Sequence, residues 1–208
     1  MPLRLTRLWH AAWPILALAN LLWAGNIVLA RGIAGDVPPV ALAYWRWTGA
    51  FCIALPFAWN QLRRDAPILL RHWRIMLVLS ATGIASFNTL SYIALNHTTA
   101  LNVLLLQSAM PLIILLWAFA LFGERPRPRQ ALGVLVSLAG VTAIAARGSF
   151  EVLLHLRLNE GDAIIMVAMA IYGAYCVLFR YRPLVSPLSF LTTAMGIGSC
   201  MMLPFYLW

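Results

Sequence analysis

The chain has 208 residues, of which 62% are hydrophobic and only 10% are charged, and its mean hydropathy is +0.84. Soluble domains are about half apolar and a quarter charged, so this composition excludes an ordinary water-soluble domain. The net charge of +9 comes from 15 arginines and no lysine. Because the arginines lie between long apolar runs, no nucleic-acid-binding face is expected, and the lack of lysine excludes Schiff-base chemistry on a lysine amine.

The residues that usually carry metal or catalytic chemistry are few and scattered. Cys52, Cys176 and Cys200 each lie within an apolar run, so they are interpreted as small buried hydrophobic residues without a disulfide. The four histidines lie at or beyond the ends of the apolar runs, and no Asp or Glu lies within one. We therefore expect no metal, no cofactor and no enzymatic activity.

Apolar stretches long enough to cross about 30 Å of hydrocarbon as helices recur along the whole chain. They predict an all-α integral membrane protein with seven transmembrane helices in this chain, near residues 11–30, 38–59, 74–95, 98–122, 130–146, 162–180 and 187–208. Among the predicted helix ends, Thr98 or Thr99 caps the fourth helix and Asp162 favours the start of the sixth. Glu124 and Arg125, after the fourth helix, are interpreted as a solvated pair or an interface anchor rather than a gate.

The arginines sort to alternate sides of these predicted helices. Eleven fall on one side and three (Arg31, Arg147 and Arg157) on the other. Cytoplasmic loops carry the excess of basic residues, so the N-terminus is predicted to be cytoplasmic.

The chain also carries a weak internal repeat. A shift of 148 positions superimposes Pro39 on Pro187, Cys52 on Cys200, and 55–57 on 203–205, both Leu-Pro-Phe. A unit of five helices must re-enter the membrane with opposite orientation, as in many inverted-repeat transporters. The predicted organisation is a first five-helix repeat at 1–146, an outer linker at 147–161, and the first two helices of a second repeat at 162–208. A complete pattern of this kind has ten helices and about 88 further residues.

Polar side chains within membrane spans are the default functional candidates. Arg46, inside the second helix, can hold an anionic group such as a carboxylate, or it can extend to the outer interface or pair with carbonyl groups of a neighbouring helix. Asn88 and Tyr92 share one face of the third helix, and Pro111 is expected to kink the fourth. The candidates for a substrate pathway are Trp23, Asn26, Trp45, Arg46, Asn88, Tyr92, Gln107, Pro111 and Tyr172. Gly133, Ser137 and Gly140 form a stripe expected to serve close helix packing.

Several short motifs, in this order and spacing, resemble the EamA-like branch of the drug/metabolite transporter superfamily. They are Leu21–Asn26, Arg46, Thr99-Ala100-Leu101, Pro111, Gly123-Glu124-Arg125-Pro126, Gly133 to Gly140, and Gly161-Asp162. The resemblance implies ten helices in two inverted halves and export or exchange of small metabolites such as amino acids, without an ATP-binding domain.

The resulting hypothesis is a secondary transporter of small metabolites, amino acids or related compounds, in the bacterial inner membrane. Its partners are a small-molecule substrate and the lipid bilayer, with no nucleic acid, and a homodimer stays open as an alternative assembly. The competing hypothesis is a truncated membrane subunit or interaction protein that does not transport.

Overall fold

The computed structural model describes residues 12–145 and 159–208, and most of the predicted outer linker lies outside these ranges. The described part is helical, with a single isolated bridge between Ala34 and Val37. The elements are α2 (Ala12–Gly32), α3 (Pro39–Arg71), α4 (Trp73–Ser80), the π-helical turn η1 (Ala81–Ser86), α5 (Phe87–His97), α6 (Ala100–Gln107), α7 (Met110–Phe122), α8 (Pro128–Ala145), α10 (Glu160–Leu178), the short 3₁₀ turn η2 (Phe179–Tyr181) and α11 (Pro187–Leu207).

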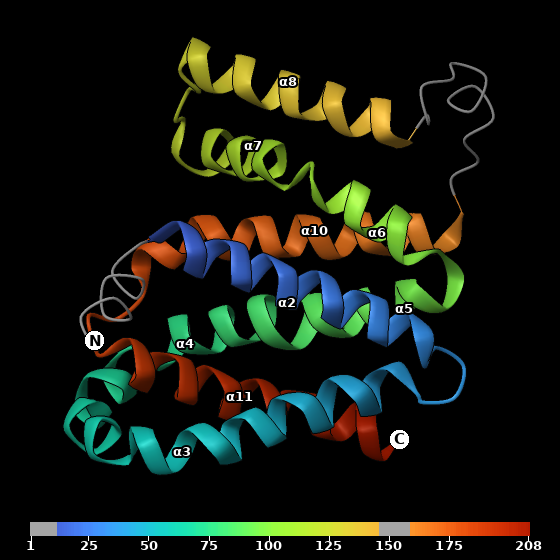
Figure 1. Cartoon of the computed structure of the whole chain (residues 1–208). Helices are drawn as coiled ribbons and strands as arrows, with labels where there is room; N and C mark the ends of the chain where they lie inside the picture. Colours follow the sequence, from blue (N-terminus) through green and yellow to red (C-terminus); the bar gives the residue numbers. More distant parts are fainter. Residues whose placement is uncertain (1–11, 146–158) are drawn as a thin grey trace, which may run out of the picture.

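The helices form an antiparallel bundle in which each rod runs opposite to the one before it in the chain (Figure 1). Four stretches of the described chain are long and apolar enough to cross a membrane: Trp13–Gly32, Trp73–His97, Glu160–Tyr181 and Pro187–Leu207. A fifth is added if α6 and α7, which meet at 42°, are counted as one broken span. The chain is therefore an all-α, multi-pass membrane protein, while seven crossings stay a prediction.

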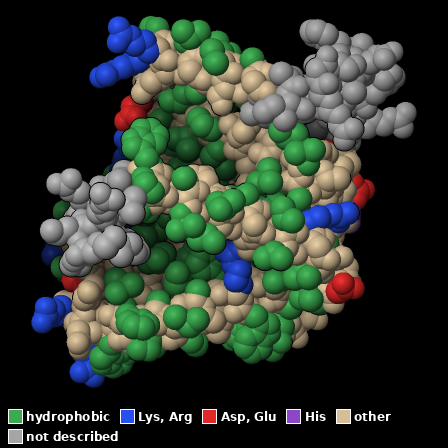
Figure 2. All heavy atoms as spheres, viewed as in Figure 1, with side chains coloured by type: hydrophobic (Ala, Val, Ile, Leu, Met, Phe, Trp, Pro, Cys, Tyr) green, Lys and Arg blue, Asp and Glu red, His purple; other side chains and the backbone are tan. Residues whose placement is uncertain are grey.

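The surface of the helical bundle suits a membrane. Large apolar side chains such as Leu21, Leu29 and Phe57 are exposed. Figure 2 shows hydrophobic side chains over the middle of the viewed face and most charged side chains near the two ends of the helices. Such a distribution suits contact with lipid tails at mid-height and with water or headgroups at the ends.

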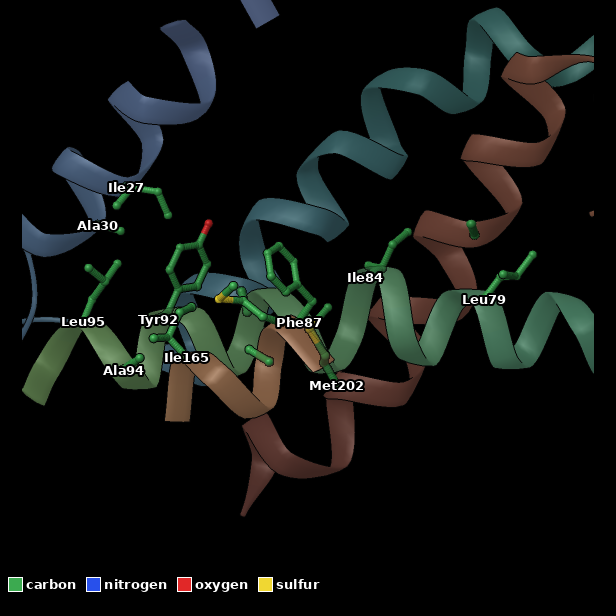
Figure 3. Close-up of a cluster of buried hydrophobic side chains, with 14 of the residues drawn as sticks. Ile27, Ala30, Leu79, Ile84, Phe87, Tyr92, Ala94, Leu95, Ile165 and Met202 are labelled. Atoms are coloured by element: carbon green, nitrogen blue, oxygen red, sulfur yellow. The ribbon is translucent and has the colours of Figure 1, made fainter. Parts of the chain in front are cut away.

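The core is centred on the rod formed by α4, η1 and α5. Half of this rod is buried, compared with 11% of α2, because α3, α10 and α11 all pack against it. Figure 3 shows its buried residues Leu79, Ile84, Phe87 and Leu95 spaced along the rod, with Leu95 near Ile27 of α2. The third predicted helix is therefore the scaffold on which the others are arranged.

The second helix is longer than predicted. α3 continues through Pro56 and Pro67 to Arg71, well beyond the predicted end at residue 59. The predicted spans 38–59 and 74–95 leave 60–73 as a connection, but Gln, Leu and Arg in its first part are good helix formers. The Asp65 carboxylate also anchors this extension to the start of α11, where it accepts a hydrogen bond from the Ser186 amide at 3.0 Å.

Two of the predicted helix ends are confirmed in detail. The Thr99 hydroxyl caps α6 by accepting a hydrogen bond from the Asn102 amide at 3.1 Å. Asp162 closes a capping box with Asn159 at the start of α10. Its carboxylate is buried and also accepts a 2.7 Å hydrogen bond from the Thr98 hydroxyl, which joins α10 to the end of α5.

The interpretation of Glu124 with Arg125 as a pair is wrong. Glu124 instead forms a two-pronged ion pair with Arg180, at 2.7 and 3.1 Å, which links the ends of α7 and α10. These hydrogen bonds from Arg180 hold the pKa of Glu124 below its ordinary value of 4.5. No sequence pattern indicates this pairing, because the two residues are 56 positions apart.

The glycine stripe of α8 is not closely packed. Gly133, Ser137 and Gly140 are all exposed, and a methyl group added at either glycine would meet no atom within 4 Å. The helix lies at the edge of the bundle (Figure 1), and Gly133 and Ser137 line an open groove of about 500 Å³ between α7 and α8. The close packing expected for this stripe is therefore absent from the described chain.

Candidate functional site

A cavity of about 750 Å³ lies among α2, α3, α5, α6 and α10. Side chains from all five helices line it, together with residues of η1 and of the bend between α6 and α7. Figure 2 shows the viewed face hollowed beside α2, with hydrophobic side chains in the hollow. The volume is within the range of pockets that hold small organic ligands.

Arg46 is the only charged side chain that lines this cavity in the described chain. It donates through Nη1 to Asn26 Oδ1 at 2.6 Å and to the Tyr92 hydroxyl, and through Nη2 to Asn88 Oδ1 at 3.4 Å. The guanidinium also lies 5.0 Å from the centre of the Trp47 ring. These neighbours connect the guanidinium on α3 to α2 and α5.

Local geometry positions these partners. The Asn88 amide group donates to the carbonyl oxygens of Gly83 and Ile84, at 3.4 and 3.1 Å, within η1. This leaves Asn88 Oδ1 free to accept from Arg46. Tyr92 lies one helical turn later on the same face, and its hydroxyl points toward α2 (Figure 3), where it also donates to Asn26 Oδ1 at 3.1 Å.

Aromatic rings form the apolar walls. Trp23 stacks on Phe87 with ring centres 5.9 Å apart, and Phe87 lies 4.3 Å from Tyr172 on α10. The Trp23 indole N–H donates to Gln107 Oε1 at 3.0 Å, which joins α2 to α6. The cavity thus combines one cationic corner with a wall of stacked rings.

The structure brings most of the sequence-predicted candidates together and separates two. Trp23, Arg46, Asn88, Gln107 and Tyr172 line the cavity, and Asn26 and Tyr92 contact Arg46. Trp45 instead is 59% exposed and packs edge-on against Tyr206, because the helical turn places it on the opposite side of α3 from the cavity. Pro111 lines a separate groove of about 500 Å³ between α7 and α8.

Sequence reasoning missed eight of the thirteen lining residues, among them Asn20, Trp47 and Phe87. Asn20 could have been found, because it shares a helical face with Trp23 and Ala24 at spacings of three and four residues. Phe87 had no such signal, since one phenylalanine within an apolar run is indistinguishable from a packing residue. Among the described residues, no group of three His, Cys, Asp or Glu side chains is arranged to hold a metal ion.

Comparisons with known proteins agree with the fold. Over 197 residues the chain is 29% identical to an uncharacterized transporter of Archaeoglobus fulgidus, covering 93% of this chain and 66% of that protein. Over 179 residues it is 28% identical to the uncharacterized transporter YyaM of Bacillus subtilis, covering 82% of this chain and 56% of that protein. The chain thus spans less than two thirds of the length of these relatives.

No solved structure matches the chain. The sequence profile of the EamA-like transporter family matches residues 12–146, which is more than half of the chain. The chain belongs to the EamA-like transporter family.

Proposed function

We propose that the chain forms the substrate-binding part of a secondary transporter that moves small metabolites, amino acids or related compounds, across the bacterial inner membrane. Transport is by alternating access and results in export or exchange. The observation that carries this proposal is the cavity of about 750 Å³, because its walls come from both predicted repeats. α2, α3, α5 and α6 belong to the first repeat, and Tyr172 on α10 to the second.

The arrangement of equivalent helices supports an inverted repeat. The α3 and α11 helices pack against each other and run in opposite directions (Figure 1). Each has a proline in its first turn, Pro39 or Pro187, and a second proline 17 residues later. The α2 and α10 helices, the first of each predicted repeat, are likewise antiparallel (Figure 1). This is the relation expected when a pseudo-two-fold axis lies in the membrane plane.

The distribution of arginine supports a cytoplasmic N-terminus. The basic clusters at 63–74, 125–129 and 180–182 all lie near the end of the bundle where α2 begins (Figure 1). Reporter fusions provide the test. A fluorescent or phosphatase reporter placed after residue 124 is expected to report the cytoplasm, and one placed after Gly35 the periplasm.

Transport itself is tested in liposomes that contain the full-length protein. Preloaded vesicles are expected to take up labelled substrate by counterflow for at least one compound among amino acids and related metabolites. Ala24 lines the cavity, so Ala24→Trp should block uptake by filling it. Leu21→Trp is the matched control, because Leu21 lies on the same helix and is 69% exposed. Absence of substrate-dependent flux across the whole panel would contradict the proposal.

A further inference from the structure

The charge balance of the cavity restricts what it can hold. The acidic residues of the described chain lie in loops or near helix ends, none lines the cavity, and no ion pair involves Arg46. Three of its five N–H groups have hydrogen-bond partners there, all of them neutral. A guanidinium inside a bundle that has only neutral partners is best stabilised by an anion, and its planar fork matches a carboxylate.

The polar atoms around the cavity that lack a hydrogen-bond partner also favour an anion. Three buried nitrogen atoms have no hydrogen-bond partner among the described residues: Asn26 Nδ2, Trp47 Nε1 and Gln107 Nε2. The hydrogen-bond partners decide which amide atom of Asn26 and Gln107 is the nitrogen. Arginine and the tryptophan indole can only donate, so Asn26 and Gln107 must present their oxygens to Arg46 and Trp23 and leave their NH₂ groups unpaired.

Every one of these unpaired atoms is a donor. Buried donors left without partners cost free energy, and their partial positive charge favours a nearby anion. A ligand with an ammonium group gains nothing from them, and no carboxylate in this part of the chain is available to neutralise it. The rings of Trp23, Phe87 and Tyr172 then leave an apolar wall for the remainder of the ligand.

We infer that the cavity binds a carboxylate ligand with net negative charge and an aromatic or apolar body, with its carboxylate on Arg46. The inference rests on the proposed function and narrows it, because it selects an organic acid over the zwitterionic amino acid of the same shape. The unpaired N–H groups of Asn26, Trp47 and Gln107 add partial positive charge around this site.

The experiment measures equilibrium binding to the full-length protein in nanodiscs at pH 7, by calorimetry. The probes are phenylacetate, 3-phenylpropionate and phenylpyruvate, with 3-phenylpropanamide as the uncharged isostere and phenylalanine as the zwitterion. At least one acid is expected to bind, with 3-phenylpropanamide and phenylalanine each weaker by about tenfold or more. These comparisons need no variant, so they do not depend on the folding of a mutant.

Variants then locate the interaction. Arg46→Gln should weaken binding of the acid by about tenfold or more, and Arg46→Lys by less, because lysine keeps the charge without the fork. Arg31→Gln is the matched control, since Arg31 donates to the Leu95 carbonyl at 2.5 Å and does not line the cavity. The affinity of Arg31→Gln for the acid should equal that of the wild-type protein.

Three results would overturn the inference: no binding of any acid, equal or tighter binding of phenylalanine or the amide, or unchanged affinity in Arg46→Gln. Binding does not require translocation, so this outcome is separate from the failure of the proposed function. Flux of an amino acid that is independent of Arg46 would leave the transporter intact and refute the carboxylate site alone.

Discussion

Gly161, in the first turn of α10, is expected to tolerate no side chain. A β-carbon at this position would lie 2.6 Å from the Ala94 carbonyl oxygen and 2.9 Å from both the His97 carbonyl carbon and Thr98 Cβ. Two of these atoms belong to the backbone of α5, which cannot rotate away as a long side chain can. Gly161→Ala must therefore push α10 away from the end of α5.

The size of the effect follows from two opposing terms. Alanine in place of glycine stabilises a helix by about 0.5–1 kcal/mol, and less in the first turn. Overpacking of a tight contact costs about 1–3 kcal/mol, and the displacement also strains the buried hydrogen bond from Thr98 to Asp162. The expected net result is a loss of about 1–2 kcal/mol in the free energy of unfolding.

The assay is reversible unfolding in mixed micelles, followed by circular dichroism, with Gly133→Ala as the matched control. Gly133 is also helical, but no atom lies within 4 Å of an added methyl group. Its replacement should leave the free energy of unfolding unchanged or raise it by up to about 1 kcal/mol. If Gly161→Ala proves as stable as Gly133→Ala, the contact between α10 and α5 is not as close as described.

Three other substitutions test separate contacts. Asp162→Ala removes a buried acceptor and a helix cap and should cost about 2–4 kcal/mol in micelle unfolding, whereas Asp36→Ala, at an exposed loop residue, should change stability by less than about 0.5 kcal/mol. Glu124→Gln should lower the melting temperature at pH 7 but not at pH 2. Because Arg180 lowers the pKa of Glu124, the stabilisation by the ionised carboxylate is fully present above the ordinary pKa of 4.5 and is lost as the pH falls through the folded value. A decrease in melting temperature that persisted at pH 2 would refute this. Pro111→Ala should allow α6 and α7 to straighten. The distance between spin labels at the exposed positions 101 and 121 should then increase by about 2 Å. An unchanged distance would mean that packing alone causes the 42° bend.

The fold followed from composition because a hydrocarbon environment leaves few choices. Apolar runs of about 20 residues must become helices in lipid, and the arginines mark the loops between them. The prediction was wrong at the end of α3, where a polar sequence stays helical outside the apolar layer. Hydropathy marks where the apolar layer stops, but it does not mark where the helix stops.

The candidate site was accessible to sequence reasoning only in part. Arg46 and Asn88 were found because a polar group within an apolar run is expensive and therefore conspicuous. Trp45 and Trp47 flank Arg46 and have the same side chain, yet only Trp47 lines the cavity. That distinction depends on how α3 is rotated about its axis, which its neighbours determine and its own sequence does not.

The π-helical turn at 81–86 has a consequence for how relatives of this chain can vary. A π turn corresponds to one residue inserted into an otherwise regular α-helix. A single residue deleted there would remove the wide turn, because six π-helical residues turn the chain through nearly the same angle as five α-helical ones. Asn88 and Tyr92 would then still face Arg46, whereas a residue deleted from the regular part of α4 has no wide turn to absorb it and would rotate them by about 100° relative to the start of α4. The turn at 81–86 is therefore the place in this helix where relatives are expected to differ in length by one residue and still keep the same cavity.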